Sequence, residues 1–328
     1  MSHFTVAVFS DGTKTVEELL APYQENNMGD CPKQYLKFFS VTKEEKERYE
    51  NEGVERVCLS NGEIIAPWEE EKLKKKFPHR TFNDGKNHFP FYENRKEYLI
   101  RNIIDPYLGN AQIVFELGER GAERRNVPFK ELYSTFDMYM KEYVDATYDE
   151  EQEDYGYWEN PNAKWDWWQI GGRWKGFLKA KEGKVGAKSL VYPIEDEQGR
   201  YAQSKVADID FEPNKDKYDK ALRWWEVVVE GSPLKDGEEE RNFLNFYNRE
   251  YLFKSYKSKE NYAMIQASVI TYAVILPDGT WYQKGQMGWF GCGSESADAS
   301  FEWDMRYKEN FIDKANPEWI LTIVDCHI

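Results

Sequence analysis

The two ends of this chain constrain its fold more than any other feature, because both have the pattern of β-strands. Residues 3–9 (HFTVAVF) are short, apolar and rich in β-branched side chains, and a Ser-Asp-Gly turn and the helix-like segment TVEELLAPY follow them. Near the other end come ASVITYAVIL, a Pro-Asp-Gly-Thr turn at 277–280 and the strand-like TWYQKGQMGWF. A helical pattern over 299–314 then precedes the last strand, EWILTIVDCHI.

This order, β-α at the start and β-β-α-β at the end, is typical of a split βαβ sheet. We therefore predict an α+β protein with a ferredoxin-like antiparallel sheet, formed by residues 1–23 and 263–328, and a large, mainly helical insertion at 24–262. The helical prediction depends on apolar residues that recur every three or four positions, as in KDKYDKALRWWEVVV. In this topology the first and last strands are antiparallel neighbours, so we expect His3 to lie close to His327.

Composition and charge disfavour several classes of protein. Aromatic residues make up 16% of the 328 residues, which is too many for a disordered chain. No apolar run approaches the ~20 residues that a membrane helix needs, and the first residues lack the pattern of a signal peptide, so we expect a cytoplasmic protein without a membrane partner. The net charge of -15 disfavours nucleic acid as a partner. The four cysteines are far apart and form no CxxC pair, so we expect free thiols at Cys31, Cys58, Cys292 and Cys326.

The most unusual segment is residues 155–176, YGYWENPNAKWDWWQIGGRWKG, which holds five tryptophans and two asparagines among 22 residues. Indole faces can stack on a base or a sugar, and an arginine can fork onto a carboxylate or a phosphate. Gly171-Gly172 would let backbone amides approach a ligand. The segment therefore favours a small polar, nucleotide-like or sugar-like ligand, bound by Asn160, Asn162, Trp165, Asp166, Trp168 and Arg173. The alternative is that the indoles are buried where the insertion joins the sheet.

A second group of polar residues follows the first predicted helix, in the segment QENNMGDC at 24–31. A loop that leaves a sheet element is a common place for a site on a rigid scaffold. We therefore add Asn26 and Asn27 to the ligand-binding candidates, and Asp30 and Cys31 to the catalytic candidates. Ordinary turn chemistry explains the asparagines and the aspartate equally well.

The third group lies at the chain ends. Strand alternation puts Asp325 and His327 on one face of the last strand and Cys326 on the other. With His3 beside them, the two histidines are candidates for acid–base catalysis or for holding a transition metal. No HxxxH or HExxH frame accompanies them, so we predict no metal site and name no cofactor.

Two further charged segments have simpler explanations. Asp208 and Asp210 in KVADIDF are two residues apart, as in some divalent-ion sites, but helix capping explains them better. The basic run at 119–125 (ERGAERR) is better explained as a solvated turn than as a phosphate clamp.

Five segments together resemble a family of uncharacterised proteins found in tailed bacteriophages and some bacteria: HFTVAVFSDGTKTVEELLAPYQENNMGDCP, GYWENPNAKWDWWQIGGRW, KVADIDF, KGQMGWFG and the ending LTIVDCHI. The resemblance spans both chain ends and the middle, and the tryptophan-rich segment is its most specific part. It implies a phage-type protein made in the host cytoplasm for host takeover, nucleotide metabolism or evasion of host defence. It implies no catalytic residues.

Three functions stay open at this point. The first is an accessory protein that binds a nucleotide-like molecule through the Trp/Asn/Arg pocket, in counter-defence or host takeover. The second is a hydrolase or transferase acting on a nucleotide or glycan-like substrate, with acid–base groups drawn from His3, Asp30, Cys31, Asp166 and His327. The third is an inhibitor that binds a host protein through aromatic and arginine anchors. The first is favoured, because stacking groups are visible in the sequence and a catalytic set is not. A cleft that joins the chain ends to the tryptophan-rich segment would favour the second.

Overall fold

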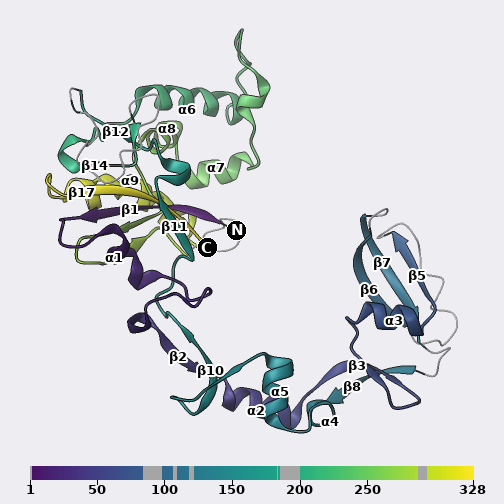
Figure 1. Ribbon diagram of the computed structural model, residues 1–328. Helices are drawn as coiled ribbons and strands as arrows, with labels where there is room; N and C mark the ends of the chain where they lie inside the picture. The colour runs from purple at the N-terminus through teal and green to yellow at the C-terminus, as the bar shows by residue number, and fades with distance from the viewer. Residues whose placement is uncertain are drawn as a thin grey trace. The chain divides into compact units, whose positions relative to one another are not determined.

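The computed structural model describes residues 2–83, 98–105, 109–117, 122–182, 184, 200–286 and 294–328. The chain forms two compact units: unit 1 is Met1–Lys37 with Trp158–Ile328, and unit 2 is Phe38–Tyr157. The sequence analysis placed the boundaries at 23/24 and 262/263 instead. Both chain ends belong to unit 1, and Figure 1 shows them side by side next to β11. Within the described residues, no helix is long and apolar enough to cross a membrane.

Unit 1 contains the strands β1 (His3–Ser10), β11 (Trp167–Ile170), β12 (Leu178–Lys179), β13 (Arg200–Tyr201), β14 (Gln203–Lys205), β15 (Ala273–Ile275), β16 (Trp281–Gln283) and β17 (Ile320–His327). Its α-helices are α1 (Val16–Leu20), α6 (Lys215–Val228), α7 (Arg249–Tyr256), α8 (Lys259–Ala267) and α9 (Ala297–Tyr307). Short 3-10 turns are η1 (Ala21–Tyr23), η2 (Lys33–Tyr35), η6 (Gly172–Trp174), η7 (Val206–Asp208) and η8 (Glu240–Phe243), and a π-helical turn, η10 (Lys308–Ile312), continues α9.

The centre of unit 1 is a six-stranded sheet in the order β11-β17-β1-β15-β16, with β14 also paired to β17. β1 and β17 are antiparallel over their full length, from the pair His3↔His327 to the pair Ser10↔Ile320. The expected pairing of the first and last strands is therefore confirmed. Ser2 and Ile328 extend it, since each donates its backbone N–H to the other's carbonyl.

The ferredoxin-like arrangement is not confirmed. β1 and β15 are parallel neighbours, with Val6 opposite Ala273, so the sheet is mixed and not wholly antiparallel. Two parallel neighbouring strands must be joined by a long crossover connection. The chain between β1 and β15 is long enough to allow either a parallel or an antiparallel pair. The described part of residues 24–262 is also not mainly helical, because it contains the strands β2 to β14. A few segments with helical periodicity led to the prediction of a mainly helical insertion, although strands lie between them.

Both faces of the sheet are covered, which explains why β1 and β17 are apolar almost throughout. Ala7 and Phe9 of β1 pack with Leu321 and Ile323 of β17 on the face that meets Tyr307 of α9. The opposite face packs against α1 and the tryptophan-rich segment through Val6, Val8, Leu19, Leu20, Trp165, Val324 and Cys326. Because side chains alternate along a strand, His3 and Asp325 belong to the face of Ala7 and Ile323.

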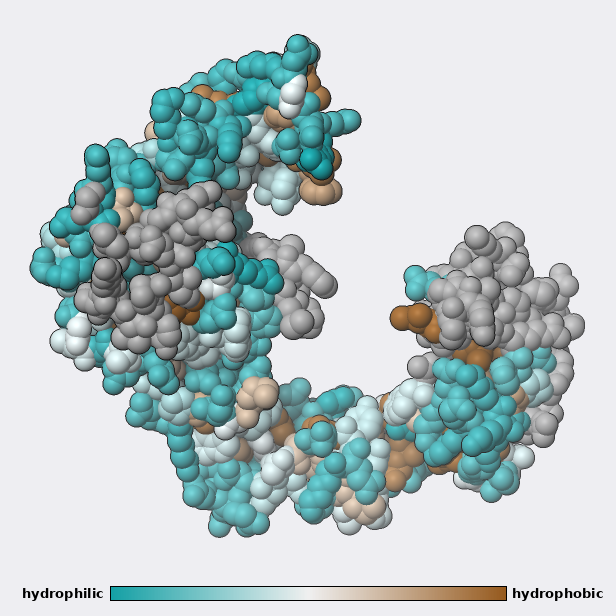
Figure 2. All heavy atoms as spheres, turned by 45° about the horizontal axis from the view of Figure 1, so that its top comes forward, coloured by the Kyte–Doolittle hydropathy of each residue, from teal (hydrophilic) through white to brown (hydrophobic). Residues whose placement is uncertain are grey.

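Unit 2 is built from small sheets and short helices. Its strands are β2 (Lys37–Ser40), β3 (Gly53–Leu59), β4 (Ile64–Ile65), β5 (His79–Asn83), β6 (Tyr98–Asp105), β7 (Gly109–Glu116), β8 (Ala122–Pro128), β9 (Thr147–Asp149) and β10 (Asp154–Glu159). Its helices are α2 (Thr42–Asn51), α3 (Glu70–Lys76), α4 (Phe129–Leu132) and α5 (Phe136–Tyr139), the last continued by the π-helical turn η5 (Met140–Val144). The strands form three sheets, β2-β10-β9, β4-β3-β8 and β5-β7-β6. On the face that Figure 2 draws, the described residues are mostly hydrophilic, and apolar residues lie in small groups.

Candidate functional site

The first part of the candidate site is a pair formed by His3 and Asp325. Nδ1 of His3 lies 2.8 Å from Oδ1 of Asp325. The second carboxylate oxygen, Oδ2, accepts the backbone N–H of Arg173 at 3.0 Å. Asp325 is only 1% exposed, so both of its oxygens are paired where an unpaired charge would be costly. This arrangement fixes the His3 ring through Nδ1 and leaves Nε2 for other partners.

His327 forms a second pair of the same kind. Its Nδ1 lies 2.6 Å from Oδ1 of Asp166, the residue before β11. The backbone N–H of Asp166 donates to the carbonyl of His327 at 3.0 Å, so main chain and side chain hold the same contact. Asn27, from the loop after α1, donates to Oδ2 of Asp166 at 3.5 Å. We call the His3–Asp325 and His327–Asp166 pairs together the paired dyads.

The two imidazole rings lie beside each other at the edge of the sheet. Their centroids are 4.9 Å apart and their planes meet at 72°. The rings of His3 and Trp167 form an edge-to-face pair with their centroids 6.2 Å apart. Both rings are partly buried, and neither Nε2 atom is hydrogen-bonded to any described residue. The site therefore presents two ring nitrogens whose orientation is fixed.

This geometry is suited to proton transfer. A carboxylate at Nδ1 fixes the tautomer of a histidine and stabilises the imidazolium that forms when Nε2 takes a proton. A base and an acid side by side are the groups that acid–base catalysis requires.

No family model, no curated protein and no solved structure matches this chain. The site is therefore interpreted from its own geometry. Among the described residues, no group of three or more His, Cys, Asp and Glu side chains is arranged as ligands for a metal ion.

A cleft of about 380 Å³ lies next to Asp166, between α1, the following loop and the start of β11. Its walls include the carboxylates of Glu17, Asp30 and Asp166 and the indoles of Trp167 and Trp168. Among the described residues, its lining contains no lysine or arginine. We call it the tryptophan cleft. Its charge disfavours anions, and its indoles and carboxylates can stack on a ring and accept hydrogen bonds from hydroxyl groups.

The acidic character of this region is also seen in Glu25, which follows the cleft residue Gln24. Burial raises the pKa of the Glu25 carboxyl group, and the carboxylates of Asp166 and Glu159 raise it further. Gln24 donates its side-chain amide to Asp30 at 3.0 Å, which fixes one of the catalytic candidates at the cleft wall.

Gly171-Gly172 has a different role from the one expected. Both residues have positive φ, 72° and 48°, which favours glycine. A Cβ atom on Gly172 would lie 2.3 Å from Oδ2 of Asp325. The double glycine therefore lets the backbone approach the Asp325 carboxylate and does not face a ligand directly.

Three of the predicted ligand-binding residues have structural partners. Asn160 is 4% exposed and donates to the carbonyls of Pro22 and Gln24, both at 2.9 Å. Trp165 is 4% exposed, and its Nε1 donates to the carbonyl of Leu20 at 3.2 Å. Asn26 donates to the carbonyl of Trp158 at 2.7 Å. These contacts attach the tryptophan-rich segment to α1 and the loop after it.

The other candidates are placed as follows. The side chains of Asn162 and Arg173 are exposed, while Trp168 is partly buried at the cleft. Cys31 is buried, and burial raises the pKa of its thiol, which disfavours a nucleophilic role. Cys31, Cys58 and Cys326 are free thiols, and Cys292 lies outside the described residues.

The two charged segments given simpler explanations form ion pairs. Asp208 pairs with Lys184 at 3.1 Å and Asp210 with Lys179 at 2.7 Å. In the basic run at 119–125, Arg125 pairs with Glu131, and residues 119–121 lie outside the described residues.

The sequence analysis found the members of the dyads but not their pairing. Asp166 was predicted to touch a ligand, and it also orients His327. Glu17 was not predicted at all.

Proposed function

We propose that this chain is an enzyme, a hydrolase or a transferase, that uses the paired dyads to move protons on a small polar substrate that extends from the tryptophan cleft, which Asp166 of the dyads lines. One observation carries the proposal: His3 and His327 lie ring beside ring, and each is held by its own carboxylate. Two oriented histidines at one place are the minimum set for concerted acid–base catalysis.

In the proposed reaction, one ring accepts at Nε2 the proton of an attacking hydroxyl group or water. The other ring donates a proton to the leaving oxygen. Asp325 and Asp166 stabilise whichever imidazolium is present. After the reaction the two rings have exchanged protonation states, and transfer through solvent restores them. General acid–base catalysis of this kind contributes about 10²–10⁴-fold to a rate.

The lining of the tryptophan cleft favours a glycan-like substrate over a nucleotide at this place. Glu17, Asp30 and Asp166 would repel a phosphate, whereas they can accept hydrogen bonds from sugar hydroxyl groups. Trp167 is 48% exposed and offers an indole face for stacking. A neutral, hydroxyl-rich ring satisfies both features.

A binding protein without catalysis is the second candidate. The exposure of Trp167, Asn162 and Arg173 favours it, because exposed aromatic and hydrogen-bonding groups are what a recognition surface needs. The phage setting, a role in counter-defence or host takeover, a host protein as partner and a cytoplasmic location stay predictions of the sequence analysis.

The test measures hydrolysis of p-nitrophenyl glycosides, esters and phosphodiesters by the wild-type protein and by His3→Asn and His327→Asn. We expect turnover of a glycoside, reduced by about 10²-fold or more in each variant. His79→Asn in unit 2 is the matched control and should keep full activity. Folded His3→Asn and His327→Asn proteins with wild-type rates would contradict the proposal. Saturable sugar binding without turnover would support the binding protein instead.

A further inference from the structure

A second and larger cleft lies along helix α6 in unit 1. Its volume is about 800 Å³, and its lining comes from α6, the η8 region and α8. We call it the α6 cleft. None of the dyad residues and none of the tryptophan-cleft residues lines it, so it is a separate site.

One face of α6 gives the α6 cleft both positive charge and aromatic surface. Lys217, Lys220 and Trp224 are spaced by three and four residues, so they share a helix face, and all three line the cleft. The Asn214 side chain accepts the backbone N–H of Lys217 and fixes the start of the helix. Lys220 is exposed and forms no ion pair with any described residue.

The aromatic wall continues onto the neighbouring helix α8. The rings of Trp224 and Tyr262 are 5.2 Å apart with their planes 30° from parallel, and both are partly exposed. Phe243 of η8 also lines the cleft, and Asn242 and Gln266 add amide groups at its walls. A planar ring can therefore lie against an indole or phenol face while amides reach its edge.

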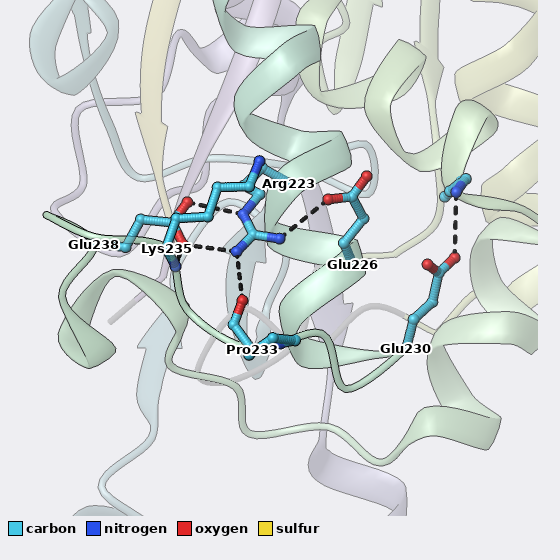
Figure 3. A network of polar contacts seen from close by, with 7 residues as sticks. Arg223, Glu226, Glu230, Pro233, Lys235 and Glu238 are labelled. Atoms are coloured by element: carbon cyan, nitrogen blue, oxygen red, sulfur yellow. Dashed lines mark hydrogen bonds and ion pairs between the residues drawn. The ribbon is translucent and has the colours of Figure 1, made fainter.

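The loop that closes the α6 cleft is held by Arg223, as Figure 3 shows. Nε and Nη2 of Arg223 donate to the two oxygens of Glu238 at 2.8 and 2.7 Å. Its Nη1 donates to Glu226 at 3.1 Å, and Nη2 also donates to the carbonyl of Pro233 at 2.8 Å. Because two carboxylates neutralise this guanidinium, the unpaired positive charge at the wall comes from Lys220.

We propose that the α6 cleft binds a planar aromatic anion of the nucleoside monophosphate class. The heterocycle stacks at Trp224 and Tyr262, the phosphate lies at Lys217 and Lys220, and Asn242 and Gln266 contact the ring edge. The net charge of -15 repels anions in general, so an anion site on this protein needs such a local group of cations. The α6 cleft combines cations, aromatic faces and amides, which the tryptophan cleft does not.

The test is isothermal titration calorimetry of the full chain with AMP as the probe, at about 50 mM salt, where screening is weak. Adenosine and ribose 5-phosphate are the partial probes, each lacking one half of the recognised chemistry. We expect AMP to bind about 10-fold or more tightly than either. Lys220→Glu should weaken AMP binding by about 10-fold or more.

Lys215→Glu is the matched control, because Lys215 is on the same helix but does not line the cleft and pairs with Asp219. It should leave the affinity unchanged. Absence of saturable binding at millimolar AMP would overturn the proposal, as would equal effects of Lys220→Glu and Lys215→Glu. AMP binding that is lost in Trp167→Ala but kept in Lys220→Glu would place the ligand in the tryptophan cleft and would also overturn it. These results are independent of glycoside turnover.

Discussion

His3 and His327 are register partners at the ends of β1 and β17, and this pairing brings their imidazole rings to a centroid distance of 4.9 Å. The carboxylates that hold them come from β17 itself and from the residue before β11. The paired dyads therefore form only when three adjacent strands, from both ends and the middle of the chain, have assembled. The geometry of the paired dyads and folding of the central sheet are thus coupled.

Asp325→Asn should destabilise unit 1 by about 1–3 kcal/mol, because a buried donor would lose its acceptor. The carboxylate accepts from both His3 and Arg173, and an amide offers one oxygen in place of two. The measurement is urea denaturation. Asp313→Asn is the control, since that aspartate is exposed and pairs with Lys308, and it should change stability by less than about 0.5 kcal/mol. Equal stability of the two variants would show that the second acceptor oxygen contributes little.

Gly172→Ala should lower the free energy of unfolding by more than the backbone strain at this position alone would. Its φ is 48°, and the new Cβ would meet Asp325 Oδ2 at 2.3 Å. Gly12→Ala is the matched control, because Gly12 also has a positive φ, 90°, but nothing lies within 4 Å of the added atom. Backbone strain should lower the stability of both variants by about 1–3 kcal/mol. Only Gly172→Ala should lose further stability, and it should also lose glycoside turnover. Matching stabilities would argue against the close approach.

Acid should loosen the loop at the α6 cleft through Glu238. Arg223 lowers the pKa of Glu238 to about 2, below its ordinary value of 4.5. A lowered pKa means that the ionised group stabilises the fold, and that this stabilisation is complete above about pH 4.5 and is lost as the pH falls through about 2. Hydrogen exchange of the α6 and η8 amides should therefore accelerate, relative to the intrinsic rate, between these values. Glu238→Gln should remove this pH dependence, and a variant that keeps it would assign the effect to another group.

The pairing of the chain ends could be predicted from sequence because both strands are short, apolar and β-branched, and because strand alternation fixes which side chains share a face. That reasoning correctly placed His3 beside His327. The direction of β15 could not be predicted, since no short turn joins it to β1. The contact of Asp166 with His327 depends on how a distant segment docks, and no local pattern encodes that. The α6 cleft is lined by three separate segments. The apolar residues of each segment, considered alone, predict only a buried helix face, so the cleft could not be predicted from sequence.

Trp165→Ala and Trp167→Ala should separate the structural from the binding role of the tryptophan-rich segment. Trp165 is 4% exposed, donates to the Leu20 carbonyl and packs with α1, so its removal should cost about 3–5 kcal/mol in urea denaturation. Trp167 is 48% exposed, so Trp167→Ala should change stability by less than about 1 kcal/mol while it weakens glycoside binding, measured as KM, through the lost stacking face. Two indoles two residues apart would then have opposite roles because one is buried in the core and the other is half exposed. If instead Trp167→Ala unfolds the protein and Trp165→Ala does not, the side-chain directions on which the tryptophan cleft depends are wrong.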